Sequence, residues 1–270
     1  MSNGGLSVMN RRTVIVTVII LICGVFSVFG NISMVAGEQG IHGTTISGTT
    51  GHIVTPSADL FWDDSEFALS TGYTMIATKG KLAHVPYVNF ALFRNFETTI
   101  ALDTFEGTFD VLTGAKWRFL DTGNTMIAVG LLGQSLDIGN ETEWAAQAYL
   151  TSTFKSSFFD QSALTTVLIG YTFQKDMKFD IDFSVGFDTL LFPSVLKEYV
   201  SLVFDVGNVS YSNDASGTDP DRGIINAGLR LNPIGLGEQL RISADIAGLD
   251  LLDGADRSFA LGVNLQMKLR

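Results

Sequence analysis

The sequence predicts an all-β protein, a closed antiparallel transmembrane β-barrel of about 12 strands, preceded by a signal peptide and a short irregular segment. The 270 residues are 46% hydrophobic and only 17% charged, with 20 Phe and 28 Gly. Beyond the N-terminal stretch, no run approaches the roughly 18 apolar residues that a membrane-spanning helix needs. Apolar content without long apolar runs is typical of a membrane barrel, because its strands alternate lipid-facing and lumen-facing residues.

The clearest alternation lies at 258–269, where one face is wholly apolar and the other is small or polar. Segments 179–188, 224–232 and 240–246 repeat the pattern. The apolar face of the last segment comprises Phe259, Leu261, Val263, Leu265, Met267 and Leu269.

Twelve segments of this kind are separated by turn signals, and most have the roughly 9–11 residues that a tilted strand needs to cross a bilayer. An even count puts both ends of the barrel on one side. Turns are predicted at 121–124, 213–217 and 233–235. The predicted strands are 66–77, 85–93, 97–105, 109–120, 125–135, 144–154, 163–173, 179–188, 200–211, 223–232, 239–249 and 258–269.

A soluble β-sandwich or a lipocalin-like barrel also alternates, but its polar face is the outside and is heavily charged. Here the polar face is rich in Gly, Ser, Thr and Asn with scattered charges, which suits a crowded lumen. The sequence therefore favours a membrane barrel, with the lipid bilayer and the outer-membrane assembly machinery as its expected partners.

The N-terminal stretch predicts secretion. Arg11 and Arg12 precede an apolar run and a small-residue site near Ala36, which predicts a signal peptide over 1–37. An uncleaved helical anchor is the alternative. We expect an irregular Gly- and Thr-rich segment at 38–65, the barrel at 66–270, and a location in a bacterial outer membrane.

The charge excludes a nucleic-acid partner. The net charge is −11, and removal of Arg11 and Arg12 with the leader leaves 15 − 28 = −13. A surface this acidic repels the phosphate backbone.

Charged residues on the polar faces are the candidate site. If the N-terminus lies in the periplasm, Lys116, Arg118, Arg230, Arg241 and Lys268 are expected toward the periplasmic mouth. Four carboxylates are expected toward the outer one: Asp103, Asp110, Asp180 and Asp182. The hypothesis is a lumen graded from acidic outside to basic inside, where the basic part holds anionic groups such as acidic sugars. Neutralisation of each charge by a neighbour is the alternative. The pore-lining candidates are Lys116, Arg118, Asp180, Asp182, Asp188, Arg230, Arg241, Asp245 and Lys268.

The run Gly48–Asp59 resembles the opening of YjbH-like outer-membrane proteins, in which a Gly–apolar–Thr-Pro–small–Ala stretch leads into the first strand. Glu66–Tyr73 follows at the expected distance, and a second likeness runs from Val185 to Tyr199. Members of that family are associated with exopolysaccharide production or export. The resemblance therefore implies an envelope role near polysaccharide and no catalytic residues. From the residues alone, the run is equally a mobile leader or a turn packed across the barrel mouth.

Catalysis, a metal site and a cofactor are not predicted. Cys23 is the only Cys and lies in the leader, there is no Gly-x-Ser-x-Gly motif, and the acidic stretch 214–221 lacks calcium-loop spacing. His42 and His52 precede the strands and His84 begins one.

Function is less closely defined. About eight strands leave a filled barrel and about sixteen an open channel, so a narrow conduit and a plugged lumen both remain open here. The sequence favours a narrow pore or envelope component. A non-conducting structural or adhesive barrel and an envelope hydrolase are the alternatives.

Overall fold

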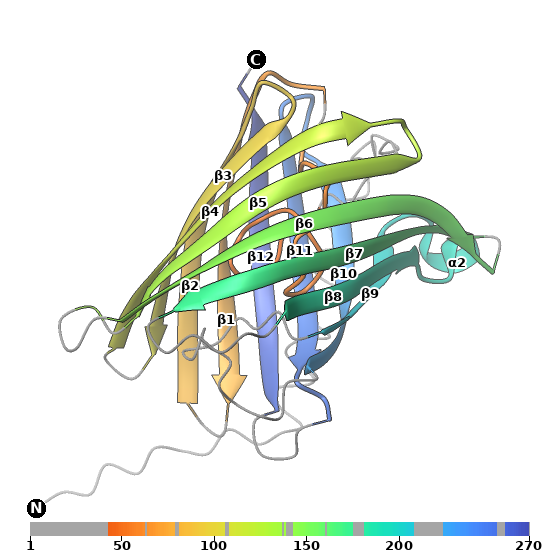
Figure 1. Cartoon of the computed structure of the whole chain (residues 1–270). Coiled ribbons are helices and arrows are strands. Elements are labelled where there is room, and N and C mark those ends of the chain that lie inside the picture. The colour runs from red at the N-terminus through yellow and green to blue at the C-terminus, as the bar shows by residue number, and fades with distance from the viewer. Residues whose placement is uncertain are drawn as a thin grey trace, which may run out of the picture. The chain divides into compact units, whose positions relative to one another are not determined.

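A computed structural model describes residues 43–62, 64–78, 81–105, 108–136, 138, 143–159, 161–174, 181–207, 224–252 and 257–269. Among them a single sheet closes into a barrel (Figure 1). The predicted signal peptide lies outside the described residues. No helix in the described part of the chain is long and apolar enough to cross a membrane. The elements are β1 (Phe67–Thr78), β2 (Lys81–Leu92), β3 (Phe96–Phe105), β4 (Thr108–Asp121), β5 (Thr125–Leu136), β6 (Glu143–Phe158), β7 (Gln161–Gln174), β8 (Ile181–Leu190), α2 (Pro193–Leu196), β9 (Val200–Gly207), β10 (Ile224–Gly235), β11 (Leu240–Leu249) and β12 (Ser258–Lys268).

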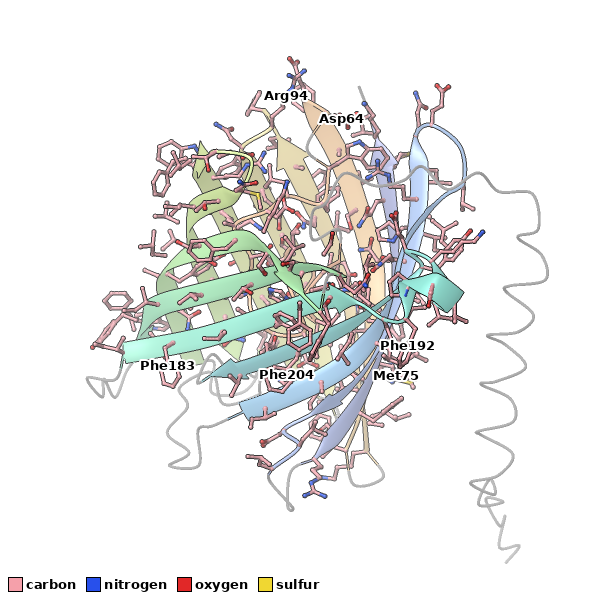
Figure 2. All side chains as sticks on the ribbon, turned by 90° about the vertical axis from the view of Figure 1, so that its right-hand side faces the viewer. Asp64, Met75, Arg94, Phe183, Phe192 and Phe204 are labelled. Carbon is pink, nitrogen blue, oxygen red and sulfur yellow. The ribbon has the colours of Figure 1, made fainter. Side chains whose placement is uncertain are left out.

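The predicted 12-strand antiparallel barrel is confirmed. Each strand pairs with its sequence neighbours, and β1 pairs with β12 from Ala68↔Lys268 to Thr78↔Ser258, which closes the sheet. We call the end where β1 begins and β12 ends the near end, and the opposite end the far end. In Figure 2, Asp64 and Arg94 mark the near end.

Some predicted boundaries differ from the observed strands. The turn expected at 233–235 lies within β10, because a register shift between Leu231 and Ile234 absorbs Pro233 as a bulge. Strand β2 begins at Lys81 rather than 85 and carries Pro86 opposite Tyr73.

The two faces of the barrel have the polarity that a membrane requires. Along β12, Val263 and Leu265 are exposed, whereas Asn264 and Gln266 are buried. The buried residues include many Thr, Ser and Asn side chains and most of the lumen charges, while the exposed ones include aromatic and branched apolar side chains such as Phe183 (Figure 2). An exterior of this kind is stable in lipid rather than water.

The described part of the predicted lead-in, from residue 43 onward, enters the barrel. Residues 43–62 are almost all buried, and they run within the lumen before the chain leaves it at the near end to begin β1 (Figure 1). We call residues 43–65, Asp63 aside, the lumen segment. Its tip is 43–57 and its stem is 58–65.

The lipid-facing exterior gives a depth-dependent prediction. Val263 lies midway along β12 and is exposed, whereas Leu269 follows the end of the strand. We expect Val263→Arg to destabilise the barrel by about 2–4 kcal/mol and Leu269→Arg by about 0–1 kcal/mol, because burying a charge in the bilayer costs most at its centre. Urea unfolding in phospholipid vesicles measures both. Equal costs would contradict a membrane-spanning exterior.

Candidate functional site: a segment bound inside the lumen

The tip of the lumen segment folds on itself. Short antiparallel bridges join Thr44 to Thr50 and Gly51 to Pro56. At the turn between the first pair, Gly48 has a φ of 91°, a left-handed conformation that favours glycine, and its Cα faces the ring of Tyr87. The tip is therefore a compact double loop rather than an extended strand, and it does not join the barrel sheet.

Apolar contacts hold the lumen segment at several depths. Ile46 and Ile53 of the tip belong to a buried cluster whose wall members include Ile76, Leu112 and Ala260. The first and last of these lie toward the far ends of β1 and β12. In the stem, Phe61 and Trp62 pack with Ala68 and Ala91, and Ala58 packs with Met126 and Ala128. The segment thus reaches from the near end into the far half of the lumen.

Arg230 of β10 is the first of three charged centres that bind main-chain atoms of the tip. Its guanidinium donates to the carbonyl oxygens of Thr44, Gly51 and His52 at 2.9–3.1 Å. Its Nε donates to the Asp245 carboxylate at 2.6 Å, and its Nη1 lies 3.6 Å from the Asp188 carboxylate. The side chain is 2% exposed, so these partners replace water.

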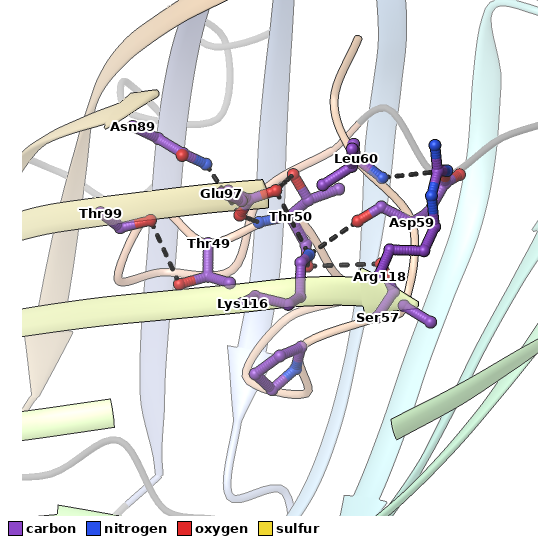
Figure 3. Close-up of polar contacts among 12 residues, drawn as sticks. Thr49, Thr50, Ser57, Asp59, Leu60, Asn89, Glu97, Thr99, Lys116 and Arg118 are labelled. Carbon is purple, nitrogen blue, oxygen red and sulfur yellow. Dashed lines mark hydrogen bonds and ion pairs between the residues drawn. The ribbon is translucent and has the colours of Figure 1, made fainter. Parts of the chain in front are cut away.

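Glu97 of β3 and Lys116 of β4 form the second centre (Figure 3). The Glu97 carboxylate accepts hydrogen bonds from the backbone nitrogen and hydroxyl of Thr50, both at 2.7 Å. Lys116 lies 3.2 Å from Glu97 and donates to the carbonyl oxygens of Thr50 and Asp59. Asn89 donates to Glu97 and to the Gly48 carbonyl. The pair therefore binds both a donor and an acceptor of the same peptide chain.

Asp205 of β9 is the third centre. One carboxylate oxygen accepts three consecutive backbone N–H groups, those of Ile53, Val54 and Thr55, at 2.7–3.0 Å. The other accepts from Asn226 at 2.7 Å. Three amides converging on one oxygen form an anion-binding concavity, here made by the lumen segment and filled by the wall.

Hydroxyl groups of the wall complete the contacts. Thr151 donates to the Pro56 carbonyl at 3.0 Å, and Thr153 accepts from the backbone nitrogen of Ala58 at 2.9 Å. The hydroxyls of Thr55 and Ser184 are hydrogen-bonded. These side chains form hydrogen bonds with polar groups of the lumen segment that have no partner in regular secondary structure.

His52 is the buried titratable group of the tip. Its Nε2 lies 2.9 Å from the Thr166 hydroxyl, and its ring packs against Gly186, where any larger residue would collide with it. Burial, reinforced by the nearby Arg230 charge, lowers the pKa of His52 to about 3. The imidazole is therefore neutral while the tip is bound.

The stem is also bound through its side chains. The Asp59 carboxylate lies 3.3 Å from Arg118 of β4, and Asp64 lies 2.9 Å from Lys268 of β12. The guanidinium of Arg241 stacks on the Trp62 ring, 4.1 Å from its centroid. Hydrogen bonding to Lys268 lowers the pKa of Asp64 below its usual range.

The lumen segment leaves little free space. A cavity of about 50 Å³ lies between it and the wall, lined by residues that include Ser47, Thr49, Thr99 and Gln147, and another of about 20 Å³ lies beside Arg230. Since one water needs about 10–15 Å³, these spaces hold a few waters and no sugar.

The structure brings the predicted residues together in two groups. Arg118, Arg241 and Lys268 lie toward the near end and contact the stem, whereas Lys116, Arg230, Asp188 and Asp245 lie around the tip. Asp182 lies in the far part of β8 and binds Gln147 and Thr172. Asp180 lies outside the described residues. That these residues line a pore stays a prediction.

The sequence interpretation missed Glu97, Asp205, Asn89 and Tyr87. Asp205 was detectable, because it falls on the polar face of an alternating strand, Val200–Gly207. Glu97 begins a predicted strand, where a charge is usually solvated. Tyr87 was assigned no role, yet its hydroxyl contacts Thr44 and Asn264.

No catalytic grouping emerges from the described histidines. His84 is exposed and hydrogen-bonded to Tyr73, and His52 is buried against Thr166 and Gly186 of the wall. No group of three or more His, Cys, Asp or Glu side chains in the described residues could hold a metal ion.

Comparisons with known proteins identify the fold. No family model and no curated protein matches the chain. A solved structure of the KdgM porin is 8% identical, with a TM-score of 0.51, and the match covers 74% of this chain and 99% of that one. The structure described as "KdgM porin in complex with disordered oligogalacturonate" is 9% identical over the same shares, with a TM-score of 0.50. A NanC porin structure is 11% identical, with a TM-score of 0.49 and coverages of 74% and 100%. The fold is that of bacterial outer-membrane β-barrels.

Asp205 gives a prediction about the tip. We expect Asp205→Ala to lower the hydrogen-exchange protection of the amides at 53–55 at least about tenfold, because hydrogen bonds to a charged acceptor contribute about 1.5–3 kcal/mol each. Asp182→Ala is the matched control, a buried wall carboxylate that binds Gln147 and Thr172. Equal loss of protection in both variants would indicate a general loosening of the barrel instead.

His52 gives a prediction about acid. The bound tip accommodates only the neutral imidazole of His52. The stability of the bound tip is therefore highest above pH 6.5, and it decreases as the pH falls toward 3, because the released tip then takes up a proton. We expect tip binding to weaken by about 1.4 kcal/mol per pH unit below about pH 6. Protection factors of the tip amides at pH 7 and pH 5 measure this. His52→Gln should remove this component, and an unchanged pH dependence in that variant would rule out His52 as its source.

Proposed function

We propose that this chain is an outer-membrane pore that its own lumen segment closes at rest. The observation that carries the proposal is that residues 43–62 fill the lumen and are bound to the wall chiefly through main-chain atoms. In this assignment the near end, which holds both ends of the barrel sheet, faces the periplasm.

Closure follows from size. The two cavities beside the lumen segment measure about 50 and 20 Å³. Neither of these cavities, which are lined by described residues, can pass a hydrated solute while the segment is bound, so we propose that passage requires the segment to move.

The chemistry of the wall supports a removable segment rather than a permanent core. Thr151, Ser184 and Asn226 would be hydrated if the tip left, and the wall charges are hydrogen-bonding groups that water can also satisfy. A core that never opens gains more from apolar packing than from buried charges, because burial desolvates each charge. The apolar contacts of the segment are divided among three separate clusters rather than joined in one continuous core.

The solute that we propose is an acidic oligosaccharide. Two observations support this class: the likeness of Gly48–Asp59 to YjbH-like proteins, which are associated with exopolysaccharide, and the oligogalacturonate complex of the KdgM porin, which shares the fold. The cations of the near end, Arg118, Arg241 and Lys268, have the charge that binds carboxylates.

A non-conducting structural barrel is the second candidate. The number of buried hydrogen bonds between the wall charges and the segment favours it, since a hydrogen bond to a charged group contributes about 1.5–3 kcal/mol. A segment held by three such centres would leave the lumen seldom without a ligand or a change of conditions.

A reversible lock separates the two candidates. In an Asp205→Ala background, which loosens the tip, we expect discrete single-channel openings in planar bilayers. Ala58→Cys combined with Ala128→Cys would tie the stem to β5, because both residues belong to one buried cluster. We expect the oxidised pair to abolish openings and a reductant to restore them.

Ala128→Cys alone is the matched control and should conduct in both redox states, with mass spectrometry reporting disulfide formation in the pair. Openings that persist in the oxidised pair would contradict closure by the lumen segment. Silence of every variant across many insertions would support the structural barrel.

A further inference from the structure

The stem of the lumen segment is strongly acidic. Between Gly43 and Ser65 the sequence contains three acidic residues and no Lys or Arg, and all three lie within 58–65, at Asp59, Asp63 and Asp64. The described ones nearest the wall, Asp59 and Asp64, contact Arg118 and Lys268. The stem therefore carries its negative charge to the basic end of the barrel.

The tip and the stem differ in whether the wall charges that they contact would keep other charged partners after the segment leaves. If the tip left, Arg230 would keep Asp245 and Asp188, and Lys116 would keep Glu97, because these partners belong to the wall. Departure of the tip would therefore leave these two cations paired with carboxylates of the wall.

At the level of the stem the balance would change. Departure of the stem takes the Asp59 carboxylate from Arg118 and the Asp64 carboxylate from Lys268. Arg118 would keep Asp121, 3.5 Å away and partly exposed, and Arg241 would lose the Trp62 ring. The near end would gain positive potential at the moment of opening.

We propose that the stem is an internal mimic of an acidic oligosaccharide. Its carboxylates occupy the places that uronate carboxylates take on Arg118 and Lys268, and its Trp62 ring covers the third cation, Arg241. A carboxylate-bearing sugar chain that enters from the near end then competes with the stem and opens the pore for itself. This inference rests on the proposed function, which supplies the movable segment.

The exposure of the two ion pairs predicts the order in which an acidic sugar chain would displace them. The Asp64–Lys268 pair is the outermost contact, with Asp64 64% exposed, whereas Asp59 is fully buried against Arg118. A polyanion arriving at the near end would therefore displace Asp64 first and reach Arg118 only as the stem withdraws.

Thiol accessibility tests the mimic in the full-length protein. Ser57 is fully buried at the junction of tip and stem, so Ser57→Cys reports withdrawal of the segment through its rate of modification by a small neutral thiol reagent. We expect oligogalacturonate to raise that rate about tenfold in vesicles, and neutral malto-oligosaccharides of equal length to leave it unchanged. The protein without the introduced thiol gives the background.

Two variants test the site. Lys268→Gln combined with Arg241→Gln should abolish the response to oligogalacturonate, although it raises the basal rate by loosening the stem. Lys81→Gln removes a cation at the far end, and we expect it to keep the full response.

The outcomes separate this inference from the proposed function. If acidic and neutral sugars raise the thiol modification rate equally, the mimic is wrong and the gated pore still stands. The same holds if neither sugar raises that rate in a protein whose loosened variants conduct. If no variant conducts, the proposed function fails. Acceleration by the acidic sugar alone, lost in the Lys268 and Arg241 variant and kept in the Lys81 variant, supports the inference.

Discussion

The constraint on which this structure depends is that a barrel facing lipid on its outside must place its polar residues inside, where each needs a partner. The wall of the lumen carries Asp205, Arg230 and the Glu97–Lys116 pair, all buried. Such charges are costly when desolvated and unpaired. The lumen segment supplies the missing partners as main-chain N–H and carbonyl groups, and the wall in turn satisfies a backbone that has little regular structure of its own. Neither part has its hydrogen bonds satisfied in a dry lumen without the other.

Binding through main-chain atoms explains the composition of the segment. A contact made with the backbone depends on the path of the chain more than on its side chains, so small residues such as Gly and Thr serve best. Gly43 and Gly51 lie where a Cβ would collide with Arg230 and with the adjacent loop. The wall uses the same device at Gly186, which makes room for His52. The Gly- and Thr-rich composition of the segment is thus a packing requirement.

The stem differs from the tip in the kind of contact that it makes with the wall, so the two ends of the segment are held differently. Its contacts include ion pairs between side chains, and the partly exposed Asp64–Lys268 pair is weakened by salt and solvent. The tip centres are enclosed, with Lys116 and Glu97 each 1% exposed. A segment held firmly at its tip and more weakly at its stem can begin to loosen from the near end, where the charge of an approaching ligand acts first.

The sequence by itself determined the barrel. Period-two alternation assigns one face of each strand to lipid, and twelve such segments, with Val263 and Asn264 on opposite faces, predict the closed sheet that the structure has. The boundaries failed where a bulge absorbed Pro233, because a bulge depends on the partner strand. Alternation also placed Arg230 and Lys116 on the inner face, but it did not identify the groups that these two side chains bind. Contacts such as Arg230 with Gly51, 179 residues apart, arise from closure of the barrel around the segment. Only the tertiary structure decided that residues 43–62 occupy the lumen, since an irregular polar stretch carries no periodicity from which its neighbours could be predicted.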